Sequence, residues 1–245
     1  LVSVKVKKGK KEMEVIMKRR KLLSGILALA MAVSLLSSCG GNPSGSAGST
    51  GSTSSSQQTS GQSEPQYLVW NMGAEPKTWD PTLSSETISE YITICMFEGL
   101  TKQTAEGYEP GVAESWDISD DGLTYTFHLR KSNWSDGTPL TAHDFEYGAY
   151  CLLNPDMGSP AAYSWFAIKN ASAYNSREIT DWAEVGVKAL DDLTLEITLE
   201  RPLNSFDRTI AVRGLYPLRQ DFVEQVGSQQ LGSSPETMLF SGPYI

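Results

Sequence analysis

The low-complexity tract over residues 40–66 sets the strongest limit on where this chain can form a core. It consists almost wholly of Gly, Ser, Thr, Gln, Asn and Pro. Such a composition buries too little apolar surface to offset the conformational entropy that an ordered chain loses. We therefore expect a flexible tether here, and a folded body that begins at Tyr67.

The segment before the tether is built like a secretory signal peptide. A positive cluster, Lys18–Lys21, precedes the apolar run Leu22–Leu36, and this order of regions is typical of such signals. A helix of about 15 residues is too short to cross a hydrocarbon core of about 30 Å. We expect a signal peptide over residues 17–38, and we interpret residues 1–16 as upstream sequence translated in error.

The signal ends on a cysteine. Leu36-Ser37-Ser38-Cys39-Gly40 resembles the lipobox of bacterial lipoproteins, in which the cysteine receives a diacylglycerol and becomes the first mature residue. The resemblance implies that Cys39 is lipidated and that residues 39–66 link this anchor to the body. Several acyl chains would hold the body durably at the outer face of the cytoplasmic membrane. The alternative is an ordinary cleaved signal with an incidental cysteine.

The exported part is strongly acidic. Residues 39–245 carry 11 Lys/Arg and 27 Asp/Glu, a net charge of −16. Phosphate backbones are bound by clustered basic residues, so we expect no nucleic-acid partner. A disulfide between Cys95 and Cys151 is possible after export, but two free thiols in apolar surroundings are favoured.

Helical and strand periodicities alternate along the body. The pattern predicts the following elements: a strand from Tyr67, a helix over Ser89–Leu100 with Ile92, Cys95, Met96 and Gly99 on one face, a hairpin over 116–130 turning at Asp121-Gly122, a helix after Thr141, a strand pair over 186–202 turning at Asp191-Asp192, and a strand from Phe240. Thr141 and Asp144 have the spacing of a capping box. This mixture indicates an α/β or α+β domain.

The sequence shows no catalytic or metal-binding constellation. His128 and His143 are isolated, and nucleophile-elbow, phosphate-loop and dinucleotide motifs are absent from the sequence. Asp121, Asp136 and Asp191 occupy turns, where aspartate needs no catalytic explanation. The six tryptophans are expected in the core or a cleft wall: Trp70, Trp79, Trp116, Trp134, Trp165 and Trp182. We expect neither an enzyme nor a cofactor or metal site.

A series of longer motifs carries a family resemblance. The motifs are Trp79-Asp80-Pro81, FEGL at 97–100, PGVAESW at 110–116, DGLTYTFHLR at 121–130, WSDGTPLTAHDF at 134–145, GVKALDDLTLEITLERP at 186–202 and SGPY at 241–244. In this order and spacing they resemble the extracytoplasmic solute-binding proteins of peptide ABC importers, the oligopeptide- and dipeptide-binding family 5.

The resemblance implies an α/β, periplasmic-binding-protein-like fold of type II. Its two lobes close around a peptide and hold it largely by its main chain. We expect only the N-terminal lobe in this chain: its first part over 67–97, an inserted subdomain over 98–218 and a return to the lobe over 219–245. The resemblance also implies a monomer that hands its peptide to the permease of an importer with its own ATPases.

Two segments are implied to touch the ligand. The first contains Ser85, Glu86 and Thr87, which otherwise form a plain exposed loop. The second follows Ser159-Pro160, where the family often has a tyrosine; this sequence has Ala161, with Tyr163 two positions later. The departure leaves other solutes open, such as nickel complexes or oligosaccharides. A transporter-independent surface lipoprotein is a further alternative, whereas a secreted hydrolase lacks a nucleophile and a base.

Overall fold

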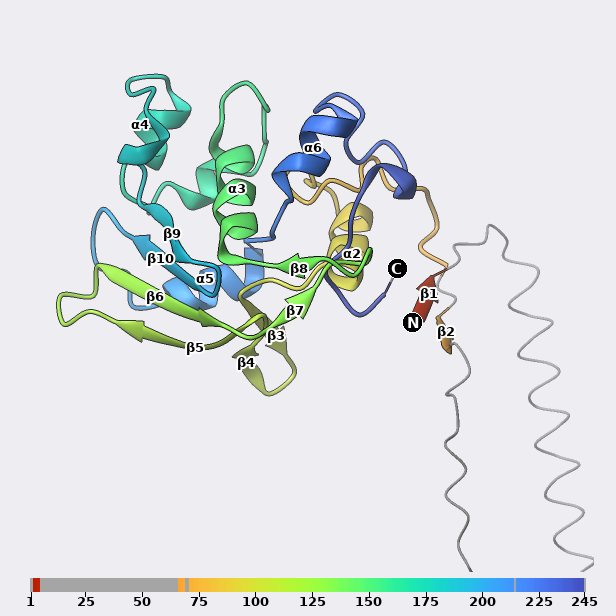
Figure 1. Ribbon diagram of the computed structural model, residues 1–245, viewed down its shortest axis with the longest axis horizontal. Helices are drawn as coiled ribbons and strands as arrows, with labels where there is room; N and C mark the ends of the chain where they lie inside the picture. The colour runs from red at the N-terminus through yellow and green to blue at the C-terminus, as the bar shows by residue number, and fades with distance from the viewer. Residues whose placement is uncertain (1, 5–65, 69–70, 214, 245) are drawn as a thin grey trace, which may run out of the picture.

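The computed structural model of the chain describes residues 2–4, 66–68, 71–213 and 215–244 (Figure 1). The expected signal peptide, Cys39 and the tether up to residue 65 lie outside the described residues. Within the described part, no helix combines the length and the apolar character needed to cross a membrane.

Short helices and strands follow one another along the chain. In order they are β1 (Val2–Val4), β2 (Gln66–Leu68), α2 (Thr87–Met96), β3 (Thr101–Thr104), β4 (Gly107–Pro110), β5 (Ala113–Ile118), β6 (Thr124–Leu129), β7 (Ser132–Asn133), β8 (Pro139–Leu140), α3 (Ala142–Leu153), the 3₁₀ turn η1 (Ala162–Trp165), α4 (Ala171–Asn175), η2 (Trp182–Glu184), β9 (Val187–Asp191), β10 (Thr194–Thr198), α5 (Phe206–Arg213), α6 (Gln220–Val226) and η3 (Pro235–Thr237). The predicted α/β class is confirmed.

An antiparallel four-stranded sheet, in the order β5-β6-β10-β9, forms the largest element of the fold. Both predicted hairpins are present, and β6 and β10 join them, with Phe127 opposite Leu195 and Tyr125 opposite Ile197. The apolar residues of β6 and β10 are buried, whereas the residues alternating with them are half-buried. Gly122 has φ +69° at the first turn, a conformation that glycine adopts readily.

Helix α3 packs against the sheet, and Figure 1 shows it lying over β9 and β10. The predicted capping box is confirmed: the Thr141 amide donates to the Asp144 carboxylate at 2.7 Å. Phe145 and Ala149 are fully buried on the predicted apolar face of the helix. The cap therefore fixes where the helix starts, and the apolar stripe fixes which side faces the sheet.

Helix α2 differs from the predicted bounds at both ends. It begins two residues earlier, because Glu86 caps it, and it ends at Met96 with Phe97 in an extended conformation. The chain leaves the helix there because the Gly99 and Leu100 carbonyls accept hydrogen bonds from residues 111–113. Ile92 and Met96 are buried as predicted.

The predicted strand from Phe240 is wrong for the described residues. Residues 240–243 form no strand, and Tyr244 has only a single bridge. The segment docks on the end of α2 instead: the Gly242 amide donates to the Met96 carbonyl at 2.8 Å. A Cβ at Gly242 would lie 2.6 Å from the Met96 carbonyl carbon, so only glycine allows this approach.

The described part of β2 pairs in parallel with β1. The family resemblance also places β2 and residues 241–245 in one sheet, and this stays a prediction because residues 69–70 and 245 lie outside the described residues. In Figure 1, α2 and α6 lie on one side of the body, and the four-stranded sheet lies on the other. The division at residues 97 and 218 likewise stays a prediction. Cys95 and Cys151 are both free.

Candidate ligand-binding pocket

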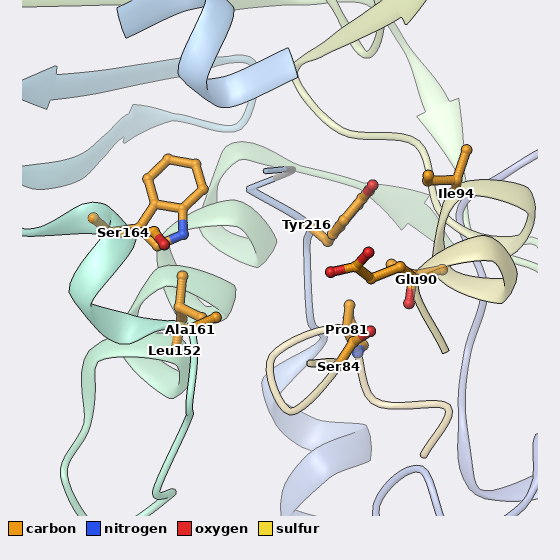
Figure 2. Close-up of a pocket in the computed structure, with 10 residues that line it drawn as sticks. Pro81, Ser84, Glu90, Ile94, Leu152, Ala161, Ser164 and Tyr216 are labelled. Carbon is orange, nitrogen blue, oxygen red and sulfur yellow. The ribbon is translucent and has the colours of Figure 1, made fainter. Parts of the chain in front are cut away.

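A pocket of about 190 Å³ opens between two parts of the chain that are distant in sequence (Figure 2). One wall comes from the loop after Asp80 and from one face of α2. Its lining residues are Pro81, Ser84, Glu90, Thr93 and Ile94. The last three lie on one helical face because they are spaced i, i+3 and i+4.

The opposite wall comes from the end of α3 and from η1. Leu152, Ala161, Ser164 and Trp165 line it. Tyr216, from the segment between α5 and α6, completes the pocket, and Figure 2 shows its ring between the two walls. The pocket therefore exists only when three separate segments are folded together.

Asp80 shapes the loop of the first wall. Its carboxylate is fully buried and accepts hydrogen bonds from the Thr82 amide and hydroxyl, each at 2.8 Å. Burial raises the pKa of Asp80, and the bonds from Thr82 oppose this shift. Gly232 packs directly against Asp80: its φ is +69°, and a Cβ there would lie 2.4 Å from the Asp80 nitrogen. This packing fixes the loop that carries Pro81 and Ser84.

A hydrogen bond links the two walls. The Ser159 hydroxyl donates to the Thr82 carbonyl at 2.5 Å. It also accepts from the Ala161 amide at 3.2 Å. The Ser159-Pro160 segment is thereby tied to the loop of the first wall, and Ala161 is held at the edge of the pocket.

Tyr216 is positioned by close packing of its backbone against α3. A Cβ at Gly148 would lie 2.2 Å from the Tyr216 carbonyl oxygen, and the Leu218 amide donates to the Asp144 carbonyl at 2.9 Å. Burial raises the pKa of Tyr216 to about 12, with a smaller contribution from the charge of Glu90. The phenol is therefore a neutral hydrogen-bond donor at physiological pH.

Two hydroxyl groups of the pocket have no partner within the described part of the chain. They belong to Ser84 and Thr93, and both oxygens are buried. A buried hydroxyl without a hydrogen bond costs about 1–3 kcal/mol. A ligand with polar atoms in this pocket would remove that cost.

Only one of the five predicted contact residues lines this pocket in the described part of the chain. Ala161 lines the pocket, whereas Ser85, Glu86, Thr87 and Tyr163 do not. Ser85 and Thr87 are exposed next to Ser84, and Tyr163 is 67% exposed. Contact of all five residues with a ligand stays a prediction.

Glu86 has a structural role as the N-cap of α2. Its carboxylate accepts from the Ile88 and Ser89 amides at 2.9 Å each. The hydroxyl of Ser89, then the backbone amides, lower the pKa of Glu86 to about 2.

Our sequence reasoning missed Glu90, Thr93 and Tyr216. The i, i+3 spacing of Glu90 and Thr93 on α2 was a usable signal, because it placed both on the face beside the predicted loop. Tyr216 carried no local signal. Trp165 was correctly expected in the core or in a cleft wall, since it is almost fully buried and lines the pocket.

Both histidines lie at the surface, as predicted. His128 pairs with Asp117 at 2.8 Å, and His143 lies 3.7 Å from Asp192. The described residues contain no group of three or more His, Cys, Asp or Glu side chains that could hold a metal ion.

A larger, open hollow of about 660 Å³ lies along β3 and residues 97–99 and shares Ile94 and Tyr216 with the first pocket. Its buried hydroxyl, on Thr101, already donates to the Asp207 carbonyl at 3.3 Å. The smaller pocket is the better candidate, because it alone of the two has unpartnered buried hydroxyls among the residues that the structure describes.

Residues 107–245 match the middle part of the bacterial extracellular solute-binding proteins, family 5. A probable deoxycholate-binding periplasmic protein, YgiS of Escherichia coli K12, is 39% identical over 74% of this chain and 34% of its own length. The periplasmic oligopeptide-binding protein OppA of the same strain is 37% identical over the same shares.

Solved structures agree with these relatives. The substrate-binding domain of an oligopeptide ABC transporter from Bacillus anthracis str. Ames matches with a TM-score of 0.66 and 39% identity, over 69% of this chain and 33% of that one. The chain thus spans about a third of the length of the relatives it matches.

Proposed function

Since this chain belongs to family 5 of the bacterial extracellular solute-binding proteins, we propose that it captures peptides outside the cell and delivers them to the permease of an ABC importer. The relatives that match are binding proteins, and several are named for oligopeptides or dipeptides. We propose a binding role without catalysis.

The observation that carries the proposal is the pocket between the Pro81–Ser84 loop and η1. It lies beside both segments expected to touch a peptide, and its Ser84 and Thr93 hydroxyls have no partner in the described part of the chain. Hydroxyl groups can accept from peptide amides and donate to peptide carbonyls. Such contacts can be made to the main chain of a peptide or to one of its polar side chains.

The proposal includes an anchor and a site of action. Lipidation at Cys39 would hold the body at the outer face of the cytoplasmic membrane, with residues 40–66 as the tether. A monomer on such a tether can reach the permease while it remains bound to the membrane.

A second candidate ligand is a solute other than a peptide. Two observations favour it: YgiS is named for deoxycholate, and Ala161 stands where family members often have a tyrosine. The smaller side chain leaves room that a tyrosine would fill. Peptides remain the first candidate because more of the matching relatives are named for them.

Calorimetry with a pool of tri- to pentapeptides tests the proposal. The protein expressed from its own gene should bind in the micromolar range, near −8 kcal/mol. Ala161→Trp should weaken binding at least tenfold, because the indole fills the pocket. The control is Ala183→Trp, since Ala183 is exposed in η2 and does not line the pocket.

Both variants should unfold within a few degrees of the parent. Equal affinity of Ala161→Trp and the parent would show that peptides bind elsewhere. Deoxycholate binding without peptide binding would favour the second candidate.

A further inference from the structure

The pocket lining contains one charged side chain, that of Glu90, which is an exposed residue, and the lining holds no side chain of opposite charge. Glu90 is the only acidic residue among the lining residues, and they include no Lys or Arg. Within the described part of the chain, the Glu90 carboxylate has no hydrogen-bond or ion-pair partner. The backbone amide of Glu90 donates to the Glu86 carbonyl at the start of α2. Figure 2 shows the carboxylate reaching from α2 toward the wall that carries Ala161 and Ser164.

The hydroxyl groups near Glu90 can, like its carboxylate, accept hydrogen bonds from N–H donors of a ligand. Thr93 is 4% exposed, and its hydroxyl oxygen has no partner in the described residues; the Ser84 hydroxyl oxygen has none either. With Glu90 they offer oxygen acceptors to a ligand that brings several N–H donors. A Lys ammonium brings three such donors and an Arg guanidinium five.

Apolar side chains line much of the remaining pocket, beside the hydroxyls of Ser164 and Tyr216. Ile94 lies on the α2 wall, whereas Leu152 and Trp165 lie on the opposite wall. Long basic side chains bury their methylene stems along apolar surface and keep the charged head near polar groups. The volume of about 190 Å³ is below the roughly 300–1,000 Å³ of pockets that hold whole ligands. The space that the described residues enclose therefore suits one ligand side chain better than a whole ligand.

We propose that this pocket selects peptides that carry a basic residue, with the Glu90 carboxylate as the counter-charge and the Thr93 and Ser84 hydroxyls as further acceptors. The inference rests on the proposed peptide-binding function and names the ligand class within it. Glu90 is then a specificity-determining residue: it makes charge-assisted hydrogen bonds to the ligand side chain, and these are stronger than neutral ones.

Calorimetry with tripeptides tests the inference on the protein expressed from its own gene. The parent peptide is Ala-Ala-Ala, and each position is replaced in turn by lysine, by norleucine, or by glutamate. Norleucine keeps the apolar stem of lysine without its charge. At one position we expect lysine to bind about tenfold tighter than norleucine, and glutamate to bind more weakly than both.

Variants separate the charge from the packing. Glu90→Gln should abolish the preference for lysine over norleucine and leave norleucine affinity within about twofold. Glu90→Lys should reverse the order and favour glutamate, which a merely unfolded variant cannot do. The control is Glu114→Gln, because Glu114 is exposed on β5, outside the pocket; it should keep the parental preference.

The outcomes distinguish the two proposals. Micromolar binding of all the peptides without a lysine preference, or with a preference that survives Glu90→Gln, would overturn the role of Glu90 and leave peptide capture intact. If no tripeptide binds more tightly than about millimolar, peptide capture is wrong and the inference falls with it.

Discussion

Replacing Gly148 with alanine should strain the contact that positions Tyr216 in the pocket. The new Cβ would lie 2.2 Å from the Tyr216 carbonyl oxygen and 3.2 Å from the Leu218 nitrogen. Both are backbone atoms, so rotating a side chain cannot relieve the clash. Helix α3 and residues 216–218 must move apart, which also stretches the hydrogen bond from the Leu218 amide to the Asp144 carbonyl.

The expected loss in the free energy of unfolding combines two costs, overpacking and a weakened hydrogen bond, with one gain in helix propensity. Overpacking of a well-packed region costs about 1–3 kcal/mol, and weakening the hydrogen bond adds about 0.5–1.5 kcal/mol. Alanine returns about 1 kcal/mol through its better helix propensity. We predict a net loss of about 2 kcal/mol, within a range of about 0.5–3.5 kcal/mol, and a loss of about 2 kcal/mol lowers the melting temperature by roughly 4–8 °C for a domain of this size.

Thermal unfolding followed by circular dichroism measures the change, with Gly99→Ala as the matched control. A Cβ at Gly99 would meet nothing nearer than 3.4 Å, so this variant should remain within about 1 kcal/mol of the parent. Restricting the unfolded chain can even stabilise it slightly. If Gly148→Ala is as stable as the parent, or if both variants lose equal stability, the claim that close packing at Gly148 positions Tyr216 is wrong.

Three further predictions concern Glu86, Asp80 and the anchor. Glu86→Ala should cost about 1 kcal/mol at pH 7, because it removes the cap of α2. The folded pKa of Glu86, about 2, lies below its ordinary 4.5, so this stabilisation is lost as the pH falls from about 4.5 to 2; a difference in urea midpoints that persists at pH 2 would argue against the cap. Burial raises the pKa of Asp80 above 3.8, so the folded state binds a proton more tightly there and ionisation lowers stability as the pH rises. Asp80→Asn should therefore gain stability relative to the parent between pH 3 and pH 7, and a pH-independent difference would contradict the burial effect. Cys39→Ser should leave an unlipidated precursor that no longer partitions into a detergent phase, whereas unchanged partitioning would rule out the anchor.

The elements that could be predicted from the sequence depend on neighbours within about fifteen residues. The hairpin at Asp121-Gly122 carries its turn residues and its alternation in one stretch, and the capping box of Thr141 and Asp144 needs only three residues of separation. The predicted helix over Ser89–Leu100 starts two residues later and ends four residues later than α2. Its cap, Glu86, is not among the preferred N-cap types, and the bonds that pull residues 97–100 into an extended path come from residues 111–113.

The site could be predicted only in part, because its walls meet through tertiary contacts. The Ser159 hydroxyl reaches the Thr82 carbonyl, and Gly148 admits the backbone of Tyr216. Nothing in the local pattern around Ser159 or Gly148 specifies these partners. Pairing of β6 with β10 is likewise non-local, so the two hairpins could be predicted individually but not as one sheet.

Mass spectrometry of the ligands that the protein retains tests the central claim most directly. The protein expressed from its own gene should be purified without denaturation and analysed before and after release of bound ligand. Peptide capture predicts a mixed population of short peptides, and the role of Glu90 predicts that lysine and arginine are enriched among them. A single non-peptide solute, such as a bile acid, a metal complex or an oligosaccharide, would contradict the account.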